Sequence, residues 1–322
     1  HLQTGTVDNV NTTTWTTVTL DHTYNSMVVV ASASYAAGDP PLATRVRNAQ
    51  GNTFQIQVQH AGGSSVPVSG VTVHYTVVEE GVYTEAQHGV NMEAVRFTST
   101  VTDSSKSWVG QRRDYSNTYV RPVVVGQVMS ANDADVSIFW ARGASAADPP
   151  SASQLFVGKH VGEDTPSKRD HEVIGYLVIE SGSGSVGNMG YVAKVGVESV
   201  VGPDNGAPVT YLLSGLDSTL AAVVSPAGMN GLDGGWPVLA GTKPVTTGGL
   251  QLFFEEDQWS DTERGHVAEQ AAYVVFGELS EPPMPNIRTG SVENVNNTSW
   301  KTVTLDHTYN SMVVVASANY SP

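Results

Sequence analysis

Two apolar patterns recur along this chain, and both predict β-strands. Phe54, Ile56 and Val58 alternate with glutamines, which is the period of a strand with one buried face. Residues 27–31 form a continuous apolar run, which is typical of a strand covered on both faces. Residues 15–20 and 71–78 carry further strand signals, and no stretch shows a convincing helical period. The sequence therefore predicts an all-β fold.

The strand pattern recurs three times. A strand of the form Tyr-x-Val-x-Glu, or a close variant, begins at Tyr75, Tyr176 and Tyr273. This spacing predicts three consecutive antiparallel β-sandwich modules of about 95 residues, the size of such a domain. The expected divisions are modules at 1–90, 91–187 and 188–280, a proline-rich linker at 281–288, and the first strands of a next repeat at 289–322. Three cores in a row predict a rod.

Residues 289–320 repeat residues 4–35 at a constant offset of 285 residues. Six of the 32 aligned positions differ, which leaves 26 identical. A repeat of this kind predicts a window cut from a longer tandem array, and a terminal half-repeat is the alternative. The second copy holds only the opening strands of a module, so we expect it to need burial by a neighbour. Its expected assembly residues are Trp300, Val303, Leu305, Tyr309, Met312, Val313, Val314 and Val315.

Composition narrows the class of protein. The chain has 16 Lys and Arg against 31 Asp and Glu, a formal net charge of −15, which argues against nucleic acid or an anionic membrane as partner. Cysteine is absent, so neither disulfides nor thiol chemistry is available. No apolar run is long enough for a membrane span. A chain rich in Thr, Val, Ser and Gly is typical of extracellular β-proteins, so we expect an extracellular or cell-surface location.

Acidic turns lie near the middle of each module, at Asp39, at Asp133 with Asp135, and at Asp233. A denser acidic run follows in the third module. Oxygen-rich loops bind Ca²⁺, so this run is a candidate calcium site, although its spacing does not match a D-x-D-x-D-G loop and a solvated loop is favoured. The candidate ligands are Glu255, Asp257, Asp261 and Glu263. No other cofactor is expected.

Signals for catalysis are weak. His266 precedes Glu269 by three residues and His171 precedes Glu172 directly, but neither pair has a visible third partner, so hydrogen-bonded structural histidines are favoured. Residues 182–187 match G-x-G-x-x-G, yet a strand pattern follows where a dinucleotide site requires a helix. Nothing singles out a pair of carboxylates for glycoside hydrolysis. We therefore expect a protein that is not an enzyme.

A strand containing RVRN at 45–48, a Gly-Asn-x-Phe strand at 51–54 and a closing strand near Tyr75 together resemble the six-stranded sandwich of H-type lectins. That resemblance implies binding of N-acetylgalactosamine-type sugars at trimer interfaces, and it carries over no individual residue. Residues 255–276 are similar to modules appended to secreted bacterial polysaccharide-acting proteins. The near-identical long repeat departs from a solitary lectin domain.

Tryptophans and sequons add two candidate carbohydrate features. Trp236 and Trp259 lie in Gly-rich or Asp-rich stretches, where an exposed indole stacks on sugar rings, so both are candidate sugar-binding residues. Asn11, Asn296 and Asn297 head N-glycosylation sequons, at matching positions of the two copies.

Three functions remain open at this point. The first is a structural segment of an extracellular tandem-repeat filament, whose partner is another copy of itself and which uses residues 289–322 for strand donation. The second is a carbohydrate-binding adhesin or lectin array, in which linked weak sites supply avidity for glycans. The third is a non-catalytic module of a polysaccharide-acting enzyme.

Overall fold

The strands of the first module form where the apolar alternation predicts them. The computed structural model describes residues 1–105, 107–280, 288–305 and 312–320. Side chains at Phe54, Ile56 and Val58 are fully buried, while the intervening glutamines are only partly buried, as period two requires. The strands of this module are β1 (Leu2–Val10), β2 (Thr16–Tyr24), β3 (Met27–Tyr35), β4 (Leu42–His60) and β5 (Val71–Glu79).

The second and third modules contain more strands than the first. The second has β6 (Gly81–Tyr83), α1 (Glu85–His88), β7 (Met92–Ser99), β8 (Gln111–Arg113), β9 (Pro122–Val128), β10 (Ile138–Arg142), β11 (Leu155–His160) and β12 (Glu172–Glu180). The third has β13 (Gly182–Val186), β14 (Met189–Val195), a 3₁₀ turn (Pro203–Asn205), β15 (Val209–Leu212), β16 (Leu216–Pro226), β17 (Trp236–Ala240), β18 (Val245–Thr246), β19 (Gly249–Glu255) and β20 (Ala271–Leu279).

Each module has one sheet in which the closing strand lies between two earlier ones. The orders are β1-β5-β3, β6-β7-β12-β9 and β13-β14-β20-β16, and their pairings are antiparallel. Tyr75, Tyr176 and Tyr273 stand in the three central strands, opposite Ala31, Gly126 and Val224 respectively. The repeated tyrosine therefore marks the same place in three related sheets, and the antiparallel all-β fold is confirmed.

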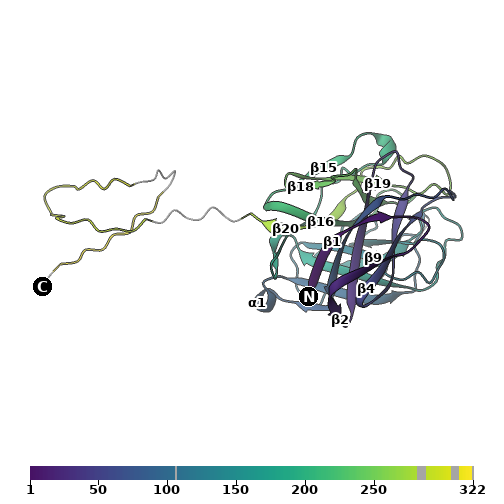
Figure 1. The fold of residues 1–322 in the computed structure, drawn as a ribbon, viewed down its shortest axis with the longest axis horizontal. Helices are drawn as coiled ribbons and strands as arrows, with labels where there is room; N and C mark the ends of the chain where they lie inside the picture. The colour runs from purple at the N-terminus through teal and green to yellow at the C-terminus, as the bar shows by residue number, and fades with distance from the viewer. Residues whose placement is uncertain (106, 281–287, 306–311, 321–322) are drawn as a thin grey trace. The chain divides into compact units, whose positions relative to one another are not determined.

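The second sheets of the modules are β2-β4, β10-β11-β8 and β17-β19-β15, with β18 added beside β19. Strand β17 also pairs in parallel with β3, through Leu239 opposite Ser34 and Ala240 opposite Tyr35. This pairing joins sheets of the first and third modules into one seven-stranded sheet. Residues 1–280 consequently form a single compact unit (Figure 1), and the expected rod of separate modules is wrong.

The modules pack into one compact unit because their apolar strands have a second buried face. Every residue of β3 and β9 is buried, so these strands are covered on both sides. One side faces the partner sheet of the same module, and the other meets neighbouring modules in a shared core that includes Val28, Val125 and Val223. Separating the modules would expose this second face, at about 25 cal/mol per Å² of apolar surface. The compact arrangement is therefore favoured over a rod.

The acidic turns close the three modules into a ring. Arg264 of the third module donates to the Ala37 carbonyl of the first over 2.9 Å. Arg45 of the first donates to the Asp133 and Ala134 carbonyls of the second over 2.8 and 2.9 Å. The Trp108 indole of the second donates to the Leu232 carbonyl of the third over 3.1 Å. Each module thus binds the turn of the next, which gives pseudo-threefold order.

The module boundaries shift relative to the sequence prediction. Strands β6 and β13 precede residues 91 and 188, yet they pair with β7 and β14, so the second and third sheets begin at Gly81 and Gly182. The predicted linker lies outside the described residues except for Arg288. Residues 281–322 form a second unit. Among the described residues, no helix has the length and apolar character to cross a membrane.

Candidate functional site

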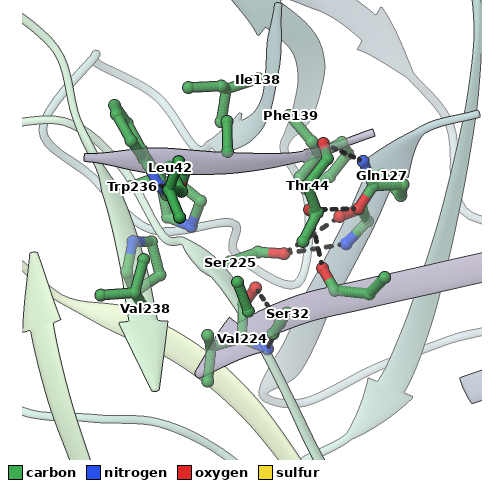
Figure 2. A pocket seen from close by; sticks show the side chains of 16 residues that line it. Ser32, Leu42, Thr44, Gln127, Ile138, Phe139, Val224, Ser225, Trp236 and Val238 are labelled. Carbon is green, nitrogen blue, oxygen red and sulfur yellow. Dashed lines mark hydrogen bonds between the residues drawn. The ribbon is translucent and has the colours of Figure 1, made fainter. Parts of the chain in front are cut away.

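The three modules meet around a small cavity of about 40 Å³. Figure 2 shows Ser32, Gln127 and Ser225 converging there from β3, β9 and β16. The Ser225 hydroxyl accepts from the Gly126 amide over 2.9 Å, and the Ser32 hydroxyl accepts from the Val224 amide over the same distance. A cavity of this size holds one or two waters at most. The site is therefore a polar junction between modules, too small for an organic ligand.

A larger and more open concavity of about 550 Å³ lies where the first module meets the other two. Its floor is polar, because Gln57 and Gln59 project from β4 and donate to the carbonyls of Thr12 and Ala134. Trp259 of the third module is the aromatic member of the lining. The lining residues are Thr12, Thr13, Gln57, Gln59, His60, Gly62, Gly63, Ser64, Ser65, Ala134 and Trp259. Amides and hydroxyls beside one indole are chemically suited to a polyhydroxylated ligand.

The two predicted sugar-binding tryptophans have different environments. Trp259 keeps 36% of its surface exposed, so its ring is available for stacking. Trp236 is only 6% exposed, and its indole donates to the Leu42 carbonyl over 3.1 Å. The prediction of an accessible Trp236 is wrong, because β17 carries this residue into the junction with the first module. Of this pair, only Trp259 contributes to an open surface.

The predicted calcium ligands are dispersed and already engaged. Glu255 is fully buried and accepts hydrogen bonds from Arg264 and from the Tyr35 hydroxyl. Asp257 accepts from the Glu163 amide of the second module over 3.0 Å. Asp261 and Glu263 are exposed and cap backbone amides of their own loop. No group of three or more acidic, His or Cys side chains among the described residues is placed to hold a metal, so the calcium site is not supported.

Charges are concentrated where the second and third modules meet. Burial raises the pKa of Asp257 to about 7, although amides of Glu163 and Trp259 favour its charged form. Burial opposes the charged form of His266, but the carboxylates of Glu256 and Glu269 outweigh it and raise the pKa of His266 to about 9. The histidine lies 3.0 Å from Glu269 and 3.5 Å from Glu256. Both ring nitrogens face carboxylates, which favours the charged imidazole and a structural role for His266.

Glu172, from the candidate pair His171 and Glu172, has a structural role like that of Glu269. Glu172 accepts from the Ser130 hydroxyl and from the Asp133 amide, and Glu269 accepts from the Asn230 and Gly231 amides. Both glutamates thereby fix the first residues of the acidic turns that close the ring. The His171 side chain is exposed, and it is the carbonyl oxygen of this residue that accepts from Asn132, so a structural role for the His171 ring is not supported. Sequence reasoning missed the role of the glutamates, since a carboxylate followed by a strand gives no signal of which turn it will hold.

The second copy of the repeated stretch keeps its local turns but not its strands. Asn9 and Asn294 both adopt a left-handed backbone, with φ of 59° and 60°. The Asn11 side chain accepts from the Thr13 amide over 2.9 Å, and Asn296 accepts from the Thr298 amide over the same distance. In residues 288–305 and 312–320, however, no β-strand forms. Local hydrogen bonds thus survive in the copy, while long-range pairing is missing.

The predicted assembly residues are correspondingly exposed. Val313, Val314 and Val315 are 91%, 74% and 88% exposed, whereas their counterparts Val28, Val29 and Val30 are fully buried. Trp300, Val303, Leu305 and Met312 are exposed as well. Tyr309 lies outside the described residues. The copy therefore presents, uncovered, the side chains that form part of the core of the 1–280 unit.

The differences between the two copies follow burial in the first. Five of the six changes fall at positions that are exposed or only partly buried in residues 4–35: Thr6, Asp8, Thr12, Thr14 and Thr16. The sixth, Ser34 to Asn319, is buried, and the Ser34 hydroxyl donates to the Gly241 carbonyl over 2.6 Å. An asparagine amide is also a donor. The core-facing side chains of the first copy are otherwise retained in the second.

The sequon asparagines lie in the conserved turn of both copies. Asn11 is partly buried, and its side-chain oxygen is engaged by the amides of Thr13 and Thr14. Asn296 makes equivalent bonds to Thr298 and Ser299, and Asn297 is exposed. Glycosylation at any of them remains a prediction.

Comparison with known proteins adds no assignment. No family model matches the sequence, and searches of curated proteins and of solved structures returned no significant match.

Proposed function

We propose that this protein is a structural segment of an extracellular tandem-repeat filament, assembled through contacts between repeats. The observation that carries the proposal is the second copy, which retains nearly all buried side chains of residues 4–35 yet exposes them. Apolar strands kept in this form need a covering partner, because exposed patches of such residues are sites of association. A like module is the natural partner, since it already buries the same sequence.

The 1–280 unit suits this role. Its three modules are closed on one another by the turn contacts of Arg45, Trp108 and Arg264, so it is a stable block from which a filament can be built. In a repeat array each block contacts only its neighbours. The strong net negative charge then limits lateral association between filaments.

Assembly of the full chain tests this proposal. Light scattering and electron microscopy of the protein over a range of concentrations should reveal beaded filaments. Val314→Asp, in the exposed copy, should abolish them, because a charge cannot be buried without a partner. Val66→Asp is the matched control, since Val66 is 68% exposed in a loop of the 1–280 unit. Discrete particles at all concentrations, or equal filaments from both variants, would refute the filament.

A second candidate function is carbohydrate binding, in line with the resemblance to H-type lectins. It is favoured by the open concavity at the junction of modules, in which Trp259 stands beside Gln57, Gln59 and Thr13. Stacking of the indole on a sugar ring, with side-chain amides binding the sugar hydroxyls, would give a weak affinity at each site. Linking many such sites in an array would raise the overall avidity. Isothermal titration with N-acetylgalactosamine should show binding that Trp259→Ala removes and Trp15→Ala retains. Absence of heat at millimolar sugar would reject it.

A further inference from the structure

We propose that residues 289–305 and 312–320 bind a second copy of the 1–280 unit in the place of β1, β2 and β3, with β5 as their central partner. This inference rests on the proposed function and names the partner and the register of the contact. It concerns chain exchange between identical molecules, so the partner surface is fully specified by the structure. Strand addition to a sheet supplies main-chain hydrogen bonds as well as apolar burial.

The acceptor is defined by the pairing around β5. Tyr75 stands opposite Gly5 of β1 on one side and Ala31 of β3 on the other. At the offset of the repeat, these positions become Gly290 and Ala316. Glycine is favoured at the first, because a Cβ there would lie 3.0 Å from the Tyr75 hydroxyl oxygen, which is a tight contact. The copy thus retains the small residues that the register of β5 favours.

Further register-specific contacts are also available to the copy. The Thr4 hydroxyl donates to the Tyr75 carbonyl over 2.7 Å, and Thr289 is identical to Thr4. Val18 of β2 faces Phe54 of β4, and Val303 is its counterpart. A displacement of the β2 counterpart by one residue would turn Val303 and Leu305 to the opposite face, because β2 has one buried face. The repeat offset therefore fixes a single register for the contact.

Assembly by this contact has a defined geometry. The donor surface lies in the 281–322 unit and the acceptor surface in the 1–280 unit, so the interface joins two different patches of the same molecule. A heterologous interface of this kind propagates into open filaments unless its rotation closes a ring. The contact competes with the chain's own residues 4–35. Because those are covalently adjacent, their effective concentration is of millimolar order.

A cysteine trap in the full chain tests the register directly, because the protein has no native cysteine. Thr17 stands opposite Gln55 at an exposed β2–β4 pair, and the Gln55 amide lies 3.3 Å from the Thr17 hydroxyl. Thr302 is the counterpart of Thr17. The variant Thr302→Cys with Gln55→Cys should therefore form disulfides between chains, since opposed residues lie within bonding range.

The trap is read after refolding from denaturant under mild oxidation, by gel electrophoresis and peptide mapping. The chain's own residues 4–35 compete for the same place at an effective concentration of about 1 mM. Refolding at about 0.1 mM chain should therefore link roughly a tenth of the molecules through positions 55 and 302, and this fraction should rise with chain concentration. The variant Thr17→Cys with Gln55→Cys must close its disulfide within one chain, which shows that the fold tolerates cysteine there. Thr302→Cys with Asp114→Cys controls for random collision, because Asp114 is 93% exposed.

Three outcomes overturn the inference: no 55–302 disulfide, one found only within a chain, or one no more abundant than the 302–114 link of the control. Filament formation is read separately by electron microscopy. Filaments without the 55–302 link would leave the proposed function standing and reject the strand contact. The link without filaments would establish exchange and reject the filament.

Discussion

The ion pair between Glu255 and Arg264 offers a quantitative test of how the ring is closed. Glu255 is fully buried, and Arg264 donates through Nε over 2.8 Å and through Nη2 to its carboxylate. A further bond from Arg264 reaches the Ala37 carbonyl of the first module. Removing one partner of a buried pair strands the other charge, at about 3–5 kcal/mol. Arg264→Met should therefore cost that amount of unfolding free energy.

The assay is urea unfolding of the full chain, followed by tryptophan fluorescence. The matched control is Arg112→Met, which breaks an exposed pair with Asp114 at 3.8 Å and should cost no more than about 1 kcal/mol. Arg264→Met combined with Glu255→Leu should recover most of the loss, because two apolar side chains leave no buried charge. The Tyr35 hydroxyl would retain the Leu42 carbonyl as acceptor.

The pH dependence of stability in Arg264→Met tests independently whether a buried, unpaired charge causes the loss. In Arg264→Met, the buried Glu255 carboxylate has lost its cationic partner, and burial disfavours the charge that remains. Acid neutralises that charge, so the destabilisation should be smaller in acid than at neutral pH. The variant should therefore approach wild type in acid. Equal losses for Arg264→Met and Arg112→Met, or a double variant weaker than the single one, would refute the argument.

Two other changes probe the module junctions. The folded pKa of Asp257 is raised to about 7, so its contribution to stability is lost as pH rises from its ordinary range through that value. Asp257→Asn loses one of the two amide bonds at every pH, but relative to wild type it should gain about 3–4 kcal/mol of stability between pH 4 and pH 8. Thermal unfolding at both pH values measures this, and a pH-independent effect would contradict it. Gly126→Ala should lower the free energy of unfolding by about 1–3 kcal/mol, because the added Cβ would lie 2.3 Å from the Phe139 ring. Gly38→Ala is the control, since a Cβ there meets open space and should leave stability unchanged. Equal urea midpoints for the two variants would contradict this packing argument.

The sequence predicts the strands but only hints at how they are gathered. Alternation at Phe54, Ile56 and Val58 identifies which side chains face a core, and that prediction is confirmed. The apolar run at 27–31 indicates burial on both faces, yet it does not say what covers the second face. The structure assigns that cover to the neighbouring modules, so the rod expected from three separate cores does not form.

The candidate sites show the same limit. Glu255 and Asp257 lie close in sequence, but Glu255 accepts from the Tyr35 hydroxyl of the first module and Asp257 accepts from the Glu163 amide of the second. The glycines before Trp236 predict a loop, but the parallel pairing of β17 with β3 buries this residue. Such long-range partners leave no periodic signal in the sequence. Trp259 was recognisable because acidic residues around it mark a loop, and it is exposed.

The repeated stretch separates local from long-range causes of structure within one molecule. Residues 4–35 and 289–320 share 26 of 32 residues, and they share the turns built by Asn9, Asn11, Asn294 and Asn296. Within residues 4–35 and the described part of 289–320, strands form only in the first copy, where β5 pairs with β1 and β3. Strand propensity in this sequence is therefore insufficient without a partner, in keeping with the dependence of β-structure on its neighbours. Whatever supplies a β5 surface to the second copy would supply its fold, and β5 of another copy of this chain is the surface that we propose.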